Sequence, residues 1–212
     1  HKINDEETIG FYLQNEHKNY EVKNYGVGGF GTFQSYLKLK KIIKKNENIR
    51  IVIYFFIDNH EIRNIGDVTY LEKTSQANKK LVYLPYVSLD ENNDILEHKP
   101  EKYLVIPFSN YSVLLTKIQK KIMRFIIKSN YTDRQIITKK LISKIDNLSK
   151  KNNIKFLFVN LASLDAKNLS YKKFLEENDI LFLDCRIKDF KNYTNSKIDM
   201  HPNNLANKEY SK

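Results

Sequence analysis

Three loops of the chain carry residue types that serve in catalysis or anion binding. The first is a glycine cluster in residues 24–32, between an expected strand and a helical pattern. Bunched glycines let backbone N–H groups approach a negatively charged ligand, although a tight turn with a positive φ explains them equally well. The cluster lacks the Lys-Ser/Thr ending of a P-loop. The second loop, Asp58-Asn59-His60, follows the most apolar run of the chain, where a polar site or a helix cap is expected.

A third loop lies near the C-terminus and contains Asp199, His201 and Pro202. An aspartate two residues before a histidine can accept a hydrogen bond from one ring nitrogen and leave the other as a base. Pro202 keeps His201 out of the helical region, which fixes how the ring is presented. A surface turn is the alternative interpretation of this short motif.

The elements that position these loops follow from apolar periodicity. Strands are predicted at residues 20–25, 51–57, 155–160 and 180–184, with helical spacing over the stretches between them. Residues 51–57 are apolar without alternation, which is typical of a parallel strand covered on both faces. Strands separated by helices predict an α/β fold, a flavodoxin-like three-layer α/β/α sandwich around a central parallel sheet.

The remaining segments fit one domain over residues 1–212, since no internal repeat or low-complexity linker interrupts the chain. Residues 66–110 are expected to form an irregular insertion that includes a hairpin, with strands near 81–89 and 103–106. Thr132 and Gln135 predict a capping box at the start of a long helix. The helix of residues 111–125 has one apolar face and a lysine-rich one, and its apolar face is expected to pack on the core; binding of an anionic membrane is the alternative.

Composition narrows the classes of function. The chain has 212 residues and a net charge of +11, but its cations are mostly lysines scattered among asparagines and isoleucines. This composition is typical of the translation of an AT-rich genome rather than of nucleic-acid recognition, so no nucleic-acid partner is expected. A single cysteine, Cys185, excludes an internal disulfide framework and a multi-cysteine zinc site. No apolar run reaches the roughly 18–20 residues of a membrane span, and membrane contact is not expected.

Taken together, the three loops resemble the GDSL/SGNH hydrolase family in order and spacing. Residues 24–34 are similar to the family's second block, 52–59 to its third and 199–203 to its fifth. Ile57 and His60 depart from the pattern, because they stand where the family has a glycine and an aspartate. The family's first block, which carries the nucleophilic serine, has no counterpart in the chain and is expected upstream of residue 1.

The resemblance implies a serine-dependent hydrolase of short-chain acyl or acetyl esters, including those of carbohydrates. It assigns His201 as the base, Asp199 as the residue that orients it, and Gly29 and Asn59 as oxyanion donors. No metal or organic cofactor is implied. The alternative is a catalytically inactive SGNH-like binding module of a polysaccharide or cell-envelope pathway. The compartment and the oligomeric state stay open.

Overall fold

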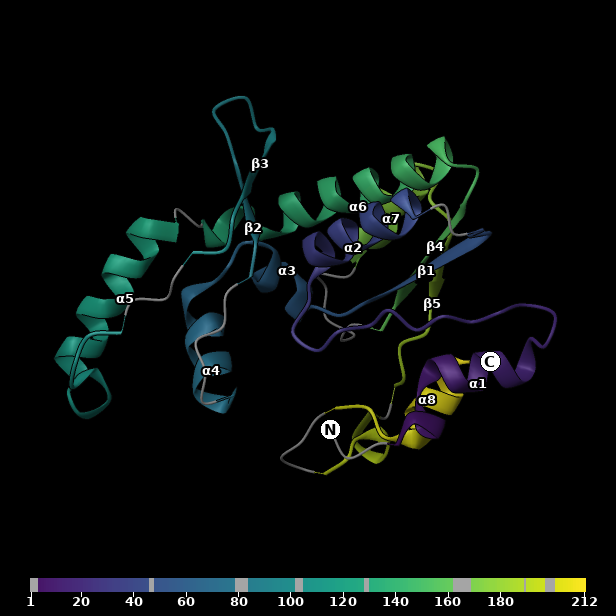
Figure 1. Cartoon of the computed structure of the whole chain (residues 1–212), viewed down its shortest axis with the longest axis horizontal. Coiled ribbons are helices and arrows are strands. Elements are labelled where there is room, and N and C mark those ends of the chain that lie inside the picture. Colours follow the sequence, from purple (N-terminus) through teal and green to yellow (C-terminus); the bar gives the residue numbers. More distant parts are fainter. Residues whose placement is uncertain are drawn as a thin grey trace. The chain divides into compact units, whose positions relative to one another are not determined.

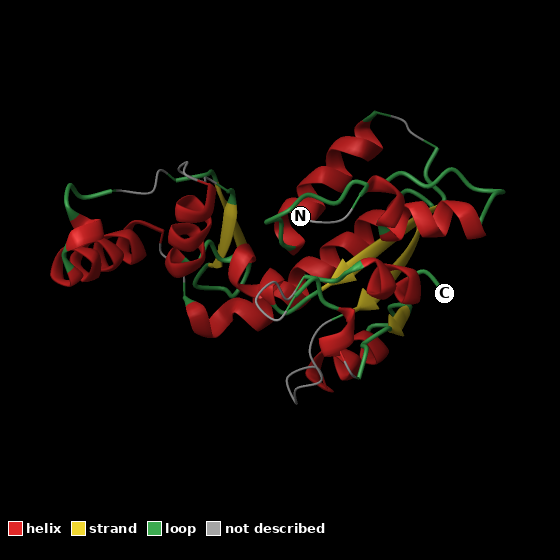
Figure 2. Ribbon diagram, turned by 90° about the horizontal axis from the view of Figure 1, so that it is seen from below, coloured by secondary structure: helices red, strands yellow, loops and turns green. Residues whose placement is uncertain are grey.

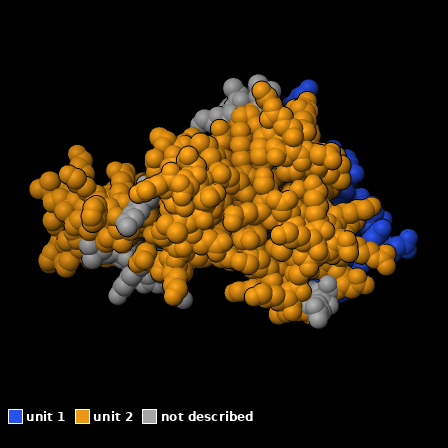
Figure 3. Space-filling model, turned by 90° about the horizontal axis from the view of Figure 1, so that it is seen from above, with its two compact units in different colours: residues 1–26, 184–212 blue, residues 27–183 orange. Residues whose placement is uncertain are grey.

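The computed structural model describes residues 4–45, 48–78, 84–101, 105–127, 130–161, 169–188, 190–196 and 201–212. Contacts divide the chain into two compact units, which Figure 3 colours separately. The smaller unit joins residues 1–26 to 184–212, and the larger one spans residues 27–183. The single domain expected from the sequence stays a prediction.

The larger unit is built on a three-stranded parallel sheet in the order β1-β4-β5 (Figure 2). The strands are β1 (Ile51–Phe56), β4 (Lys155–Asn160) and β5 (Phe182–Asp184). β1 and β4 are parallel, with Tyr54 opposite Phe158. Their β-branched and aromatic residues favour a pleated, largely buried strand. The predicted α/β class, with a parallel sheet flanked by helices, is therefore confirmed.

One face of this sheet is covered by three helices, α2 (Thr32–Lys44), α6 (Arg134–Lys151) and α7 (Leu169–Glu177). Figure 1 shows α2 and α6 side by side above the strands. The core between them contains apolar side chains from all three helices and both long strands: Leu39, Tyr54, Phe56, Ile142, Ile145, Phe156, Phe158, Tyr171 and Leu175. Apolar residues three or four positions apart place each helix's buried stripe against the sheet.

The opposite face of the sheet is less covered than the sequence predicts. Ile51 and Ile53 keep 45% and 38% of their surface exposed, and Leu181 and Leu183 are also exposed. In the described part of the chain β1 stands at the end of the strand order, with β4 as its neighbour. The expectation that β1 is covered on both faces is therefore wrong for Ile51 and Ile53, because alternate residues of the strand face an uncovered side.

The strand predicted at residues 20–25 is absent from the structure, which shows irregular chain there. The reason is that nearby side chains form hydrogen bonds with the backbone N–H and carbonyl groups of this segment. The Gln14 side chain donates to the Tyr20 carbonyl at 2.8 Å and accepts from the Val22 N–H at 2.8 Å. Asn24 Oδ1 accepts from the Gly26 N–H at 2.9 Å. Side chains thus satisfy groups that a strand would use in a ladder.

Residues 66–110 are more regular than expected. They contain helix α4 (Val68–Asn78) and an antiparallel hairpin of β2 (Tyr86–Leu89) and β3 (Ile95–His98). The hairpin itself is confirmed, but its second strand is Ile95–His98. Residues 84–85 and 105–106 are not in a strand, and residues 81–83 and 103–104 lie outside the described residues. The Asp90 carboxylate sets the turn by accepting from the N–H groups of Asn92 and Asp94, at 2.9 and 2.8 Å.

Two further helix predictions need correction. Helix α5 (Val113–Ile127) buries Gln119, Met123 and Ile127, whereas the apolar face expected in the core is exposed. At the start of α6 no capping box forms, since the N-cap Asp133 makes no side-chain cap. Instead Asn130 accepts from the Thr132 N–H at 3.1 Å, and residues 131–133 form a 3₁₀ turn, η3.

The smaller unit contains α1 (Ile9–Glu16), α8 (Asn204–Tyr210) and two 3₁₀ turns, η1 (Asp5–Glu7) and η5 (Phe190–Tyr193). Thr8 caps α1 by accepting from the Phe11 N–H at 3.3 Å. Asn207 of α8 donates to the Glu7 carbonyl at 2.9 Å, which ties the chain's C-terminal helix to the segment before α1. None of the helices in the described ranges is long and apolar enough to span a membrane.

Candidate functional site

The glycine loop of the larger unit is a tight turn held by two larger side chains. The Phe30 N–H donates to the Val27 carbonyl at 3.1 Å, and Gly29 has a φ of +84°. A β-carbon at Gly29 would lie 3.0 Å from Tyr70 Oη, which donates to the Gly29 carbonyl at 2.9 Å. Arg63 Nη1 donates to the Phe30 carbonyl at 2.8 Å. The turn interpretation is therefore confirmed, and the loop is fixed by groups from two helices.

The same loop lies against the short helix α3 (Asn59–Asn64), which follows β1. A β-carbon at the buried Gly31 would lie 2.7 Å from Asn64 Oδ1 and 3.0 Å from the His60 carbonyl. Glycine at this position therefore permits a close approach of the loop to α3. Asn59, the first residue of α3, is exposed. Gly29 and Asn59 thus lie on adjoining segments of one unit.

The Gly29 amide remains available as a donor. Within the residues that the structure describes, its N–H donates to no protein acceptor, whereas its carbonyl is bound by Tyr70. Stabilisation of an anion requires an N–H group that is held in place and makes no hydrogen bond within the fold. Ser35, a few residues later, donates its hydroxyl back to the Gly31 carbonyl at 2.9 Å and is thus part of the helix start.

His60 is a neutral, structural histidine. Its Nδ1 lies 2.7 Å from Tyr54 Oη, and Tyr54 in turn donates to Thr32 Oγ1 at 2.9 Å. Because the tyrosine proton is used on Thr32, the His60 Nδ1–H donates to the Tyr54 oxygen. Burial lowers the pKa of His60 from its usual 6.5 to about 3, and the nearby Arg63 charge lowers it further. A neutral imidazole here does not supply the negative charge of the aspartate in the family pattern.

This buried imidazole makes stability depend on pH. The unfolded chain takes up a proton on His60 below about pH 6.5 while the folded chain resists it down to about pH 3. The contribution of His60 to the free energy of unfolding is therefore fully present above pH 6.5. It is lost as the pH falls below this value, by up to about 1.4 kcal/mol per pH unit. Urea unfolding at pH 7 and pH 5 measures the loss. His60→Gln should flatten the slope, and equal slopes in both proteins would contradict the assignment.

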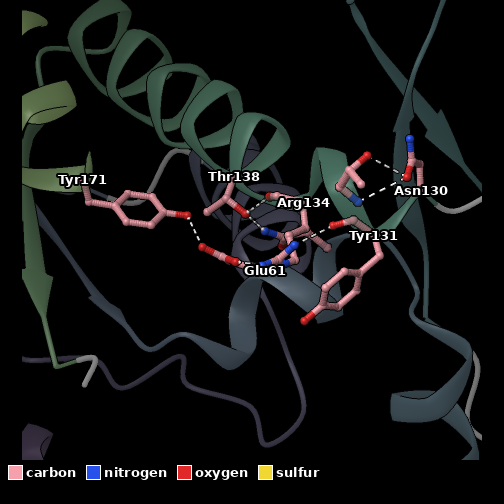
Figure 4. A network of polar contacts seen from close by, with 8 residues as sticks. Glu61, Asn130, Tyr131, Arg134, Thr138 and Tyr171 are labelled. Carbon is pink, nitrogen blue, oxygen red and sulfur yellow. Dashed lines mark hydrogen bonds and ion pairs between the residues drawn. The ribbon is translucent and has the colours of Figure 1, made fainter. Parts of the chain in front are cut away.

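Glu61, the residue after His60, forms a buried ion pair with Arg134 (Figure 4). Glu61 Oε2 lies 3.1 Å from Arg134 Nε, and Glu61 Oε1 accepts from Tyr171 Oη at 2.8 Å. Arg134 also donates to the Tyr131 carbonyl at 2.8 Å and stacks over the Tyr131 ring, 3.9 Å from its centroid. Burial and the negative charge of Glu61 raise the pKa of Tyr171. The pair joins α3, α6 and α7 beneath the site.

Asn64 extends the network to the glycine loop. Its Nδ2 donates to Thr138 Oγ1 at 2.8 Å and to Thr32 Oγ1 at 3.1 Å, and its Oδ1 accepts from the Phe33 N–H at 2.9 Å. One buried amide thus ties the start of α2 to α6. These contacts hold the start of α2, which directly follows the glycine loop, against α3 and α6.

Sequence reasoning missed this network, although one signal pointed to it. The chain has only five arginines among 36 cations, and Arg63 and Arg134 are both engaged in fixed contacts at the site. A planar guanidinium suits carboxylates and carbonyls better than a lysine does. A rare arginine in a lysine-rich chain therefore indicates a fixed contact with a buried carboxylate or carbonyl group. Asn64 and Tyr171 carry no comparable signal.

The other two predicted site residues belong to the smaller unit. His201 is exposed and lies outside any helix, and its carbonyl accepts from the Asn195 N–H at 3.0 Å. Pro202 bridges to Thr194, and Asn203 caps α8 by accepting from the Ala206 N–H at 3.1 Å. The backbone that presents His201 is thus held on both sides. Asp199 lies outside the described residues.

The structure therefore brings Gly29 and Asn59 onto adjoining segments of the larger unit and places His201 in the smaller one. Cys185 is partly buried and its pKa is raised by burial, which suits a packed thiol rather than a nucleophile. Among the described residues, no group of three or more His, Cys, Asp or Glu side chains is arranged to hold a metal ion. In comparisons with known proteins, no family model, curated protein or solved structure matches the chain.

Proposed function

We propose that the chain belongs to a serine-dependent ester hydrolase of the GDSL/SGNH type and carries its oxyanion donors and its base. The observation that supports this most is the Gly29 turn, fixed by Tyr70 and Arg63 against the segment that begins with Asn59. It supplies a positioned backbone N–H and an exposed side-chain amide on adjoining segments. Preorganised backbone and side-chain donors of this kind stabilise the oxyanion of acyl transfer.

In the proposed mechanism a serine upstream of residue 1 attacks the ester carbonyl while His201 removes its proton. Asp199 orients the imidazole and stabilises its protonated form. The Gly29 N–H and the Asn59 amide donate to the oxygen that becomes negative. His201 then protonates the leaving alcohol, and water releases the acid from the acyl-enzyme with the same base. Short acyl or acetyl esters, including those of carbohydrates, are the proposed substrates.

The three-layer sandwich belongs to the same proposal. The exposed side chains of Ile51, Ile53, Leu181 and Leu183 form the face that a second helical layer would cover. Parallel sheets are normally buried on both faces. Such a layer would bury the face that these four side chains leave exposed.

One observation favours the alternative, an inactive SGNH-like binding module. His60 is neutral and only partly exposed where the family has an aspartate, so the support of Asn59 differs from the pattern. In that case the exposed Asn59 amide and the Gly29 N–H would bind an acyl or sugar oxygen without turnover. Activity measurements separate the two functions.

The test is hydrolysis of p-nitrophenyl acetate by the natural protein that carries this chain. Asn59→Ala should lower kcat by about 10²–10³-fold, the usual effect of losing one side-chain oxyanion donor. Asn147→Ala removes an equally exposed amide from α6 and should leave kcat unchanged. Turnover that survives Asn59→Ala would exclude the oxyanion role, and an inert wild-type protein would favour the binding module.

A further inference from the structure

Helix α5 has an apolar face that the fold does not bury. Leu114 and Phe125 are 67% and 84% exposed, and Ile118, Ile122 and Ile126 are exposed as well. Figure 1 shows α5 beside α4, and the contact is made by the other side of the helix, where Met123 and Ile127 pack on α4 residues Val68 and Leu71. Contiguous exposed apolar surface of this kind marks an interaction site.

The spacing of this face is that of a helix pair. Leu115, Ile118, Ile122 and Phe125 follow one another at intervals of three, four and three residues. This 3–4 alternation is the seam along which two helices interlock their side chains. These side chains are exposed or half-buried and follow one another along most of α5. A partner helix could therefore contact several consecutive turns of α5.

The charge beside the seam is positive on one edge. Lys117, Lys121 and Arg124 are exposed there, and residues 102–132 contain no Asp or Glu. On the opposite edge of the seam α5 packs on α4 through Met123 and Ile127. Lys120, which lies beside the three cations, is paired with Glu72 at 2.8 Å. Within the residues that the structure describes, no acidic side chain pairs with Lys117, Lys121 or Arg124. A bound helix would therefore meet three cations along one side.

We propose that the α5 seam (Leu114, Leu115, Ile118, Ile122, Phe125 and Ile126) docks an amphipathic helix of a partner protein whose apolar stripe is bordered by Asp or Glu. Charge complementarity selects this occupant. A second copy of the same face brings no negative charge to the three cations, since α5 contains no acidic residue. A narrow apolar seam with cations along one edge is better suited to binding a helix than to binding a lipid surface. The proposal is independent of the ester hydrolase.

The test uses the full chain and two fluorescein-labelled helical peptides with leucine seams, one bordered by glutamates and its twin by lysines. Fluorescence anisotropy should show the glutamate peptide binding at least ~10-fold more tightly than its twin, a difference of about 1.4 kcal/mol. The variant Ile118→Ser/Phe125→Ser should weaken that binding by at least ~10-fold, because it removes two anchors of the seam. Leu205→Ser changes an exposed leucine on α8 and should have no effect.

Three outcomes would overturn the proposal. Equal affinity for both peptides would contradict the proposal that the partner helix is selected by its acidic residues. Binding of phosphatidylserine vesicles that Ile118→Ser/Phe125→Ser abolishes, without peptide binding, would make the seam a lipid surface. A dimer in sedimentation equilibrium that the same variant dissociates, again without peptide binding, would make it a self-association face. The substituted residues are exposed, so an unchanged melting temperature verifies that folding is intact.

Discussion

Glu61→Ala should destabilise the protein by about 3–5 kcal/mol, the usual cost of removing one partner from a buried ion pair. The side chains of Glu61 and Arg134 are 8% and 17% exposed, so the arginine left behind has little access to water. Tyr171 would lose its acceptor at the same time. Because a domain's whole stability is about 5–15 kcal/mol, the variant should unfold at a much lower urea concentration.

Matched variants separate the charge effect from a general one. Glu176→Ala removes an exposed acid that lies 3.8 Å from Lys172 and should cost less than about 1 kcal/mol. Tyr171→Phe removes one hydrogen bond and should cost about 1 kcal/mol. Glu61→Met combined with Arg134→Met should recover part of the loss, since no charge is left unpaired. A loss for Glu61→Ala no larger than that for Glu176→Ala would contradict the role given to the pair.

In the proposed hydrolase, His201→Ala should lower kcat/KM for p-nitrophenyl acetate by at least ~10⁴-fold, because a triad without its base cannot activate the serine. The side chain is exposed, so the loss should come without a change in melting temperature. His17→Ala removes another exposed histidine of the same unit, after α1, and should leave kcat/KM unchanged. Activity within tenfold of wild type in His201→Ala would exclude this residue as the base.

The elements that sequence reasoning predicted well are those whose pattern alone decides their structure. The apolar runs of β1 and β4 and the helical stripes of α2 and α6 bury large areas on one face, and this burial outweighs local competitors. At residues 20–25 the alternation predicts a strand that does not form. There the Gln14 side chain took the backbone groups, which depends on how α1 and the following segment meet and is invisible to periodicity.

The orientation of α5 was wrong for a related reason. Its stripe of isoleucines, leucines and phenylalanine predicts burial, but periodicity says only which residues share a face, not whether that face has a partner. The helix turned Met123 and Ile127 toward α4 instead. The positive φ of Gly29 followed from glycine chemistry, whereas the Glu61–Arg134–Tyr171 contacts join residues up to 110 positions apart. Pairings at that separation are set by the tertiary fold.

The most direct test of the proposed site is a crystal structure of the natural protein inhibited by a phosphonate ester. The proposed site predicts a covalent adduct whose phosphonyl oxygen lies within about 3.1 Å of both the Gly29 nitrogen and the Asn59 amide nitrogen. The His201 ring should lie within hydrogen-bonding reach of the modified serine. An adduct elsewhere, or His201 more than about 10 Å from the Asn59 side chain, would show that these residues do not form one catalytic site.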